Sequence, residues 1–285
     1  MFEIISVRSI TGHDGFFNYP SGICLHSDSN LFYIADMHNK RICWLTEDGS
    51  VGALSNIVDD HSCVSLGRPL AVWVTKQGTL FTADAEHNKI FYKNRQDDVW
   101  KPICMDSKFA FNLPGGVAVD ENGNVYTNDF LNNRLVRITT EGKVTTLLEG
   151  DENLKKPYGI FYKNKRLYFT DTENGRICYI SLIDGHTHVF EPQIETKNLY
   201  TPIALTLDEE GNIYICEQRN MYFLDVKKNT LSLALDRDIW KEQMFKHSIK
   251  YKICHMGALT VKRKGEIYWV DTLKGCVYQM ILNLP

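Results

Sequence analysis

The sequence predicts an all-β fold: a closed six-bladed β-propeller of four-stranded antiparallel blades, with residues 1–285 as a single domain. Three observations lead to this prediction. One unit recurs six times along the chain, an acidic residue closes an apolar strand in each unit, and the last unit lacks a fourth strand. A fixed period of this length indicates stacked supersecondary units, each of which buries a face of its neighbour.

Each unit begins with a proline followed two residues later by glycine or alanine. Proline has no N–H to donate, so it is tolerated at the first residue of a strand, and a small residue lets six strands crowd around one axis. The five regular steps are Pro20-Ser21-Gly22, Pro69-Leu70-Ala71, Pro114-Gly115-Gly116, Pro157-Tyr158-Gly159 and Pro202-Ile203-Ala204, and the sixth is the degenerate Met256-Gly257-Ala258.

The third unit shows the expected order of elements. Short strands bounded by Gly, Asn and Asp, without a helical period, are typical of all-β proteins. In chain order the predicted segments are a strand at Gly116–Val119, a turn at Asp120–Gly123, a strand at Asn124–Asn128 that leads to Asp129, a strand at Arg134–Ile138 and a strand at Lys143–Leu148.

The six acids that close the second strands are expected to shape turns rather than to catalyse. Carboxylates can accept hydrogen bonds from the backbone of a turn, and the asparagines that follow tolerate a positive φ. The acids are Asp36, Asp84, Asp129, Asp171, Glu217 and Asp271.

Closure of the ring is predicted from its two ends. The sixth unit stops after three strands near Leu282, whereas Phe2–Ile10 reads as a strand that belongs to no unit. Because a propeller must protect its strand edges, we expect Phe2–Ile10 to supply the outer strand of the last blade.

Composition bears on the partners and the cellular compartment that we expect for the protein. A net charge of −3 gives no general attraction to nucleic acid or to an anionic membrane, and no apolar run reaches the length of a membrane span. The N-terminal segment has an acid at Glu3 and alternating apolar residues, whereas a secretory signal needs a basic start and a longer apolar block. The eight cysteines form no C-x-x-C pair. We therefore expect a reduced, cytoplasmic monomer, and leave open whether any cysteines pair.

The repeat resembles the NHL-repeat family of six-bladed β-propellers. The segment Pro114–Ile138 follows that family's motif best, and Lys40-Arg41-Ile42 and Gly175-Arg176-Ile177 repeat its end. Tyr168-Phe169-Thr170-Asp171 and Tyr268-Trp269-Val270-Asp271 are similar to the related YWTD blades of lipoprotein receptors. The resemblance implies the fold but leaves the function open, since six-bladed propellers of this kind include lyases, lactonases, RNA-binding proteins and scaffold proteins.

The central mouth is expected to lack catalytic residues, metals and cofactors. The middle residue of each Pro-x-Gly step should face the mouth, and none of the six is a histidine or a carboxylate. The resemblance implies zinc held by histidines in the lyases and calcium held by acids in the lactonases. Only Asn18 and Asn112 could contribute oxygen ligands near these positions, which is too little for a divalent cation.

The residues expected to bind a ligand at the mouth are Arg68, Lys156, Tyr158 and His255, together with Asn18 and Asn112. Cations next to an aromatic ring suit a carboxylate or an acidic peptide. The sequence thus favours a non-catalytic binding propeller for a protein segment or a small acidic ligand. A hydrolase or lyase with an atypical site and an RNA-binding propeller are the alternatives. Two long loops, Asn56–Gly67 and Asp236–Cys254, are further candidates for function.

Overall fold

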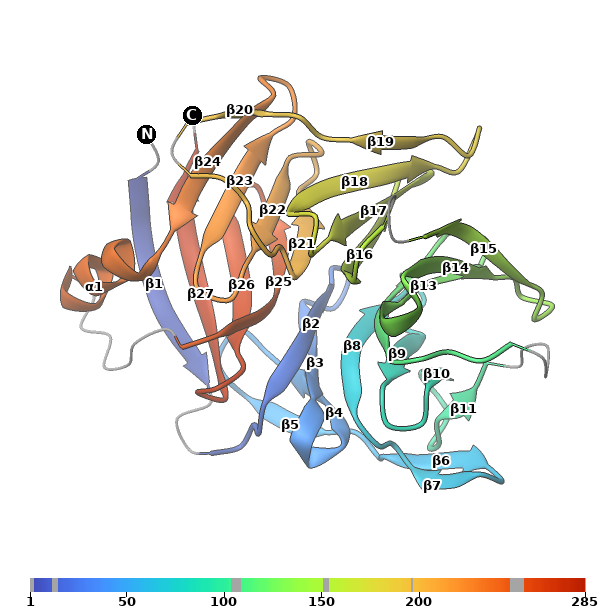
Figure 1. Cartoon of the computed structure of the whole chain (residues 1–285). Helices are drawn as coiled ribbons and strands as arrows, with labels where there is room; N and C mark the ends of the chain where they lie inside the picture. The colour runs from blue at the N-terminus through green and yellow to red at the C-terminus, as the bar shows by residue number, and fades with distance from the viewer. Residues whose placement is uncertain are drawn as a thin grey trace.

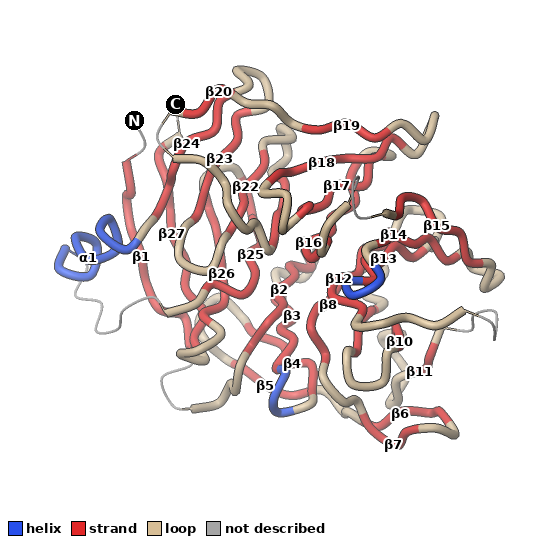
Figure 2. The backbone as a smooth tube through the Cα atoms, in the orientation of Figure 1, coloured by secondary structure: helices blue, strands red, loops and turns tan. Residues whose placement is uncertain are grey.

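Six antiparallel blades surround a central axis in a computed structural model that describes residues 3–11, 15–103, 109–150, 154–195, 197–246 and 254–284 (Figure 1). Figure 2 shows how strands dominate the chain. The predicted six-bladed β-propeller is confirmed.

Each blade runs from an innermost strand at the axis to an outer strand. Blade 1 is formed by β2 (Pro20–His26), β3 (Leu31–Asp36), β4 (Arg41–Leu45) and β5 (Val51–Ala53). Blade 2 is formed by β8 (Pro69–Val74), β9 (Leu80–Asp84), β10 (Lys89–Lys93) and β11 (Lys101–Pro102). Blade 3 is formed by β12 (Pro114–Val119), β13 (Val125–Asp129), β14 (Arg134–Ile138) and β15 (Val144–Glu149).

The second half of the ring follows the same order. Blade 4 is formed by β16 (Pro157–Lys163), β17 (Arg166–Asp171), β18 (Arg176–Ser181) and β19 (Thr187–Val189). Blade 5 is formed by β21 (Ala204–Leu207), β22 (Ile213–Cys216), β23 (Met221–Asp225) and β24 (Thr230–Leu235), with the extra strand β20 (Gln193–Ile194) parallel to β24. Blade 6 is formed by β25 (Met256–Arg263), β26 (Glu266–Asp271), β27 (Cys276–Asn283) and β1 (Glu3–Thr11).

The N-terminal strand completes blade 6, as the sequence predicted. Strand β1 pairs antiparallel with β27, from Glu3 opposite Asn283 to Thr11 opposite Val277. Figure 1 shows the two ends of the chain lying side by side in this blade. The strand ends one residue later than predicted, and Phe2 lies outside the described residues. Ring closure therefore depends on contacts between the first and last strands of the chain.

Small residues at the axis allow the blades to meet. A Cβ atom added to Gly22 would lie 2.9 Å from the Cα of Ala71 in the next blade, and one added to Gly159 would lie 2.9 Å from the Cα of Ala204. Carbon atoms do not approach so closely without displacement, so glycine is required where these innermost strands touch. This confirms the sequence interpretation of the Pro-x-Gly steps.

The six strand-closing acids are buried and tie each blade to the loop that precedes it. Asp129 accepts hydrogen bonds from the backbone N–H of Asn112 at 2.6 Å, from Asn132 at 2.8 Å and from Arg134 Nε at 2.7 Å. Asp36 makes the same set of bonds in blade 1. The carboxylates thus accept hydrogen bonds from the loop that precedes the first strand of their unit as well as from their own turns. The sequence predicted only the bonds within the turns. Their role is structural, because their oxygens already have partners.

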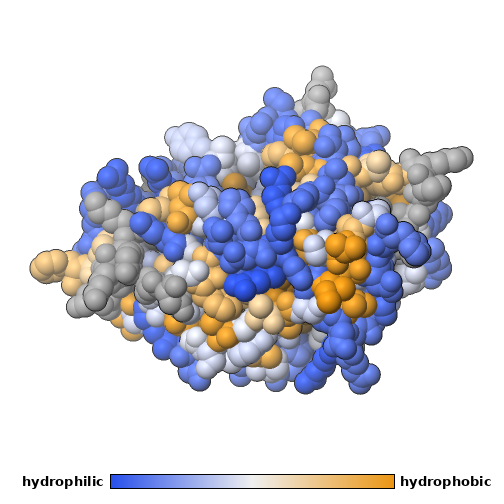
Figure 3. All heavy atoms as spheres, turned by 90° about the horizontal axis from the view of Figure 1, so that it is seen from below, coloured by the Kyte–Doolittle hydropathy of each residue, from blue (hydrophilic) through white to orange (hydrophobic). Residues whose placement is uncertain are grey.

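The hydrophobic core lies in the seams between neighbouring blades. The residue three positions before each strand-starting proline inserts into a seam, and we call it the seam plug. Four plugs are fully buried: Phe17, Leu66, Phe111 and Leu154. Burying a side chain of this size stabilises the fold by roughly 1.5–3 kcal/mol. On the face shown in Figure 3, polar residues predominate and hydrophobic patches lie between them.

The two long loops contain more regular structure than expected. Residues 57–65 form a hairpin of β6 (Ile57–Asp60) and β7 (Cys63–Ser65). Within Asp236–Cys254 the chain forms the helix α1 (Arg237–Lys246), on the outside of the ring (Figure 2). Trp240 of this helix is buried against Trp269 and Tyr278, so α1 caps the seam between blades 5 and 6. In the described part of the chain, no helix is long and apolar enough to span a membrane.

Candidate functional site

The six residues expected to face the mouth do line the axis. The connections that enter the innermost strands and those that join the second and third strands all lie at one end of the ring, which is the mouth. The residue after each strand-starting position lines the central pocket: Ser21, Leu70, Gly115, Tyr158, Ile203 and Gly257. None of these six residues, which include Ser21 and Tyr158, is a histidine or a carboxylate.

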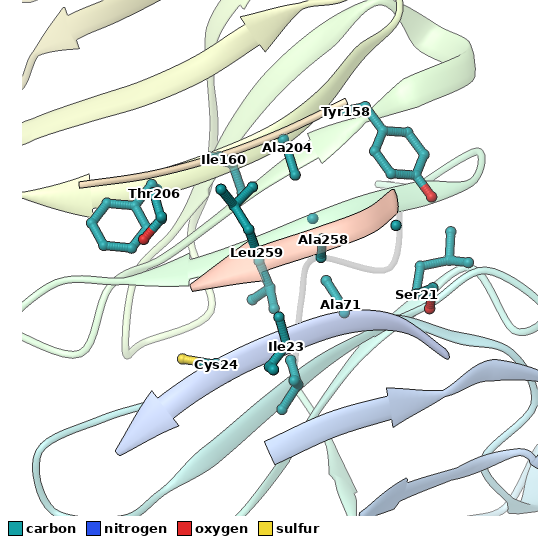
Figure 4. A pocket seen from close by; sticks show the side chains of 18 of the residues that line it. Ser21, Ile23, Cys24, Ala71, Tyr158, Ile160, Ala204, Thr206, Ala258 and Leu259 are labelled. Atoms are coloured by element: carbon teal, nitrogen blue, oxygen red, sulfur yellow. The ribbon is translucent and has the colours of Figure 1, made fainter. Parts of the chain in front are cut away.

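An aliphatic floor closes the axis beneath the mouth. The residue three positions after each strand start points inward, and the six together are Ile23, Val72, Val117, Ile160, Leu205 and Leu259. Figure 4 shows Ile23, Ile160 and Leu259 converging at the centre, with Ser21 and Tyr158 toward one end. Only about 80 Å³ of space remains along the axis. A ligand at the mouth thus meets an apolar floor and does not pass through the ring.

A pocket of about 350 Å³ opens at the mouth above this floor. Its described lining comes from blades 1, 3, 4, 5 and 6. The lining residues are Ser21, Met37, Phe130, Tyr158, Thr172, Ile203, His255, Gly257 and Thr272. Of the residues predicted to bind a ligand, Tyr158 and His255 belong to this lining.

Four lining residues were missed by the sequence reasoning, and they share one position. Met37, Phe130, Thr172 and Thr272 each follow the buried acid of their unit directly. The carboxylate fixes the start of the turn after the second strand, and the next side chain is then directed toward the axis. The repeat itself contained this signal, because the acids were recognised but the residues after them were not considered.

Aromatic rings form one wall of the pocket. The rings of Phe130 and Tyr158 meet edge to face with centroids 5.6 Å apart. Lys156 Nζ lies 5.3 Å from the centroid of Phe130, within the range of a cation–π contact. Lys156 therefore stands at the rim beside this wall, although it is not part of the lining.

Arg68 reaches the same region from blade 2. Its side chain is exposed, while its backbone N–H is held by Asp84 at 3.0 Å. Burial raises the pKa of Tyr158, and the positive charge of Arg68 partly opposes this effect. The structure thus brings Arg68 within electrostatic reach of Tyr158, across the mouth from its own blade.

Asn18 and Asn112 lie away from the pocket. Both are exposed, and neither lines the mouth pocket or the axis. Their backbone N–H groups donate to the buried acids Asp36 and Asp129. Their structural contacts are therefore those of loop anchors, and the structure does not bring them together with Tyr158 and His255.

His255 is the imidazole in the described lining of the pocket. Burial lowers its pKa, Asp271 opposes this shift, and Arg219 reinforces it. Its Nδ1 atom is buried without a hydrogen-bond partner among the described residues, as is Oγ1 of Thr272 in the same lining. In blade 4 the threonine that corresponds to Thr272 is Thr172, and it donates to the backbone oxygen of Pro202 at 2.8 Å. Because burial lowers the pKa of His255, its imidazole is favoured in the neutral form near neutral pH.

Among the described residues, the charges of the mouth loops are mainly positive. These loops enter the innermost strands or follow the buried acids. Their described cations are the exposed Lys40, Arg68, Lys155, Arg219 and Lys274 and the half-buried Lys156, and their described exposed acids are Glu86 and Glu173. The buried acids beneath are held by backbone N–H groups and, in three blades, by arginine. Although the whole chain has a net charge of −3, positive charges outnumber exposed acids in the part of the rim that the structure describes.

Within the described residues, no three His, Cys, Asp or Glu side chains gather closely enough to hold a metal ion.

Comparison with known proteins supports the architecture. The family model of the NHL repeat matches residues 17–45, which span β2, β3 and β4. Blade 1 is an NHL repeat. The curated proteins include no match to the chain.

Several solved structures share the propeller fold at low identity. A gluconolactonase from Xanthomonas campestris has a TM-score of 0.72 at 13% identity, over 97% of this chain and 89% of that one. Virginiamycin B lyase from Staphylococcus aureus has a TM-score of 0.65 at 14% identity, over 99% of each chain. A chain from a complex of nidogen and laminin has a TM-score of 0.59 at 18% identity, over 76% of this chain and 85% of that one. At such identities the likeness shows the fold alone.

Proposed function

We propose that this NHL-repeat propeller is a non-catalytic binding protein whose mouth receives a protein segment that carries acidic groups. The observation that carries the proposal is the composition of the mouth pocket. Its wall is formed by Phe130, Tyr158, Met37 and Ile203, and none of its described lining residues is a carboxylate. Apolar and aromatic surface at the centre with polar groups at the rim is typical of protein-binding sites.

The charges of the rim support an acidic partner. Lys156 lies beside the aromatic wall and Arg68 lies within electrostatic reach of Tyr158, and neither cation has an ion-pair partner among the described residues. Arginine can hold a carboxylate through two hydrogen bonds, and lysine adds a point charge. Exposed charges of this kind contribute chiefly to the rate of association and to selectivity. An apolar side chain of the segment would enter the pocket while neighbouring acids contact the rim.

A second candidate is a hydrolase or lyase of the six-bladed kind. Two of the similar folds are named as a gluconolactonase and a lyase, and the unpartnered, neutral His255 is the feature of this mouth that could act on a proton. A general base needs a pKa near the working pH and a reachable proton. A mouth-bound substrate turned over by the wild type and not by His255→Ala would favour this candidate.

Selection of peptides by phage display tests the proposal without a known partner. The full chain is immobilised, a library of random twelve-residue peptides is panned against it, and the selected peptides are measured by calorimetry. We expect sequences with an aromatic or aliphatic residue next to Asp or Glu. The double variant Arg68→Glu and Lys156→Glu should weaken their binding by more than tenfold, which is about 1.4 kcal/mol or more.

The matched control places the same charge change on the opposite end of the ring. Lys76 and Lys143 are exposed cations in turns of blades 2 and 3 away from the mouth. Lys76→Glu with Lys143→Glu should leave peptide binding within twofold of the wild type. If both double variants weaken binding equally, the effect is one of net charge and the mouth is not the binding site.

A further inference from the structure

A second pocket lies in the seam between blades 4 and 5, away from the mouth pocket. It has a volume of about 360 Å³ and opens to solvent. Its apolar lining includes Ile177, Phe190, Leu199, Ile215, Leu224 and Leu231. The chain that leaves β19 runs along the outer edge as β20 and then turns back toward β21, and so forms a strap over this seam (Figure 1).

Comparison among the repeats shows what is unusual in this seam. The seam plugs Phe17, Leu66, Phe111 and Leu154 are at most 5% exposed. The corresponding plug here is Leu199, which is only partly buried against its cluster and lines the pocket instead of filling it. The residue after it, Tyr200, is 63% exposed at the entrance. The seam therefore retains a concave apolar space in a ring whose other described plugs are tightly packed.

We propose that this seam pocket binds a small neutral aromatic molecule of one or two rings. The volume falls in the range of ligand pockets, which are typically concave and mostly apolar with a few polar groups. Phe190 and Tyr200 offer aromatic surface, and aromatic pairs favour offset or edge-to-face contacts. Aliphatic side chains such as Ile177, Ile215 and Leu224 provide the other walls.

The charges at the pocket edge favour a neutral ligand. Arg176 lies in the lining, but its Nε already donates to the buried Asp171 at 2.7 Å. Glu191 is also part of the lining and would repel a carboxylate. An anionic ligand would have to compete with Asp171 for the guanidinium, whereas a neutral ring needs only the apolar walls and a polar atom such as the side chain of Asn198.

Indole and indole-3-carboxylate form a suitable pair of probes, because they share a ring system and differ in charge. Binding to the full chain is measured by calorimetry and by ligand-observed NMR. We expect indole to bind, and indole-3-carboxylate to bind at least about tenfold more weakly, a difference of ~1.4 kcal/mol. Equal binding of the two probes, or no binding of indole at millimolar concentration, would overturn the proposal.

The variant Leu199→Phe locates the probe. Phenylalanine is the natural plug in two other seams, at Phe17 and Phe111, so the fold accepts it at this position of the repeat. We expect Leu199→Phe to raise the melting temperature and to abolish indole binding. Tyr200→Ala, at an exposed side chain, should weaken indole binding without lowering the melting temperature by more than a degree or two.

Phe130→Ala in the mouth pocket serves as the comparison variant. Indole binding that survives Phe130→Ala and is lost in Leu199→Phe supports the seam pocket. Binding that is lost in Phe130→Ala and retained in Leu199→Phe places the ring at the mouth and contradicts the proposal. Because peptide binding at the mouth is measured separately, failure of the seam pocket does not bear on the proposed function.

Discussion

Replacing Ile4 by alanine tests whether the N-terminal strand holds the ring closed. Ile4 is 7% exposed and packs with Val7 in the core of blade 6, among side chains from β26 and β27. If β1 were loosely attached, shortening this side chain would change little. In the closed ring it removes most of a buried side chain and leaves a cavity.

The expected cost follows from the burial of Ile4. Isoleucine-to-alanine changes in a packed core destabilise by roughly 2–5 kcal/mol, from lost transfer energy and from the cavity. Ile4 lies near the end of β1, where the structure can partly relax, so we expect about 2–3 kcal/mol. The neighbouring Ile5 provides a matched control, because it is 49% exposed and lies where the pairing register with β27 shifts. Ile5→Ala should cost less than ~0.5 kcal/mol.

Urea unfolding followed by circular dichroism gives both free energies. We expect Ile4→Ala to lower the midpoint without a change in the slope of the transition, since a change in midpoint alone reports stability. Equal free energies of unfolding for Ile4→Ala and Ile5→Ala would refute the reasoning, because closure by β1 requires that the two faces of this strand differ.

Three further predictions concern the buried acids, the hairpin insertion and the mouth. Asp129→Asn should destabilise the protein by about 2–4 kcal/mol in thermal or urea unfolding, because it leaves Arg134 without its buried partner; a loss below ~0.5 kcal/mol would contradict the structural role of these acids. Asp60 is partly desolvated, which raises its pKa, but hydrogen bonds and the charge of Lys89 outweigh this and lower the pKa to about 2. Its contribution of about 1–2 kcal/mol is therefore complete above pH 4 and lost as the pH falls toward 2, and Asp60→Asn should remove that part of the pH dependence of unfolding. Phe130→Ala should weaken binding of phage-selected peptides by about tenfold or more, since it removes the aromatic wall, whereas Leu131→Ala, at an exposed neighbour, should leave the calorimetric affinity unchanged.

The repeat made the architecture predictable because its signals are local. A proline that starts a strand, a small residue at the axis and an acid at the end of the next strand each have a physical cause within a few residues. The missing last strand then predicted closure by the first one. Asp36 and Asp129 show the limit of this approach, since the backbone N–H groups that they bind lie in loops far earlier in the chain, at Asn18 and Asn112.

The site was less predictable, because it depends on which blades meet. Tyr158 and His255 were identified from their position near the strand starts, and both line the pocket. Met37 and Phe130 were missed, although the acids before them were recognised, because their direction toward the axis follows from the turn geometry. The hairpin at 57–65 was also read as a loop, since its strands of three or four residues have too few positions to show alternation.

The proposal that the mouth binds a protein segment is tested most directly by NMR of methionine methyl groups. The chain has seven methionines, of which Met37 lies in the mouth pocket, while Met221 and Met280 are buried in blades 5 and 6 and Met244 lies in α1. A protein labelled with ¹³C at these methyl groups is titrated with a phage-selected peptide, and each resonance is assigned by Met→Leu substitution. We predict that the Met37 signal shifts in proportion to binding while those of Met221, Met244 and Met280 stay in place. A peptide that binds without moving the Met37 signal, or that moves the Met244 signal instead, would contradict binding at the mouth.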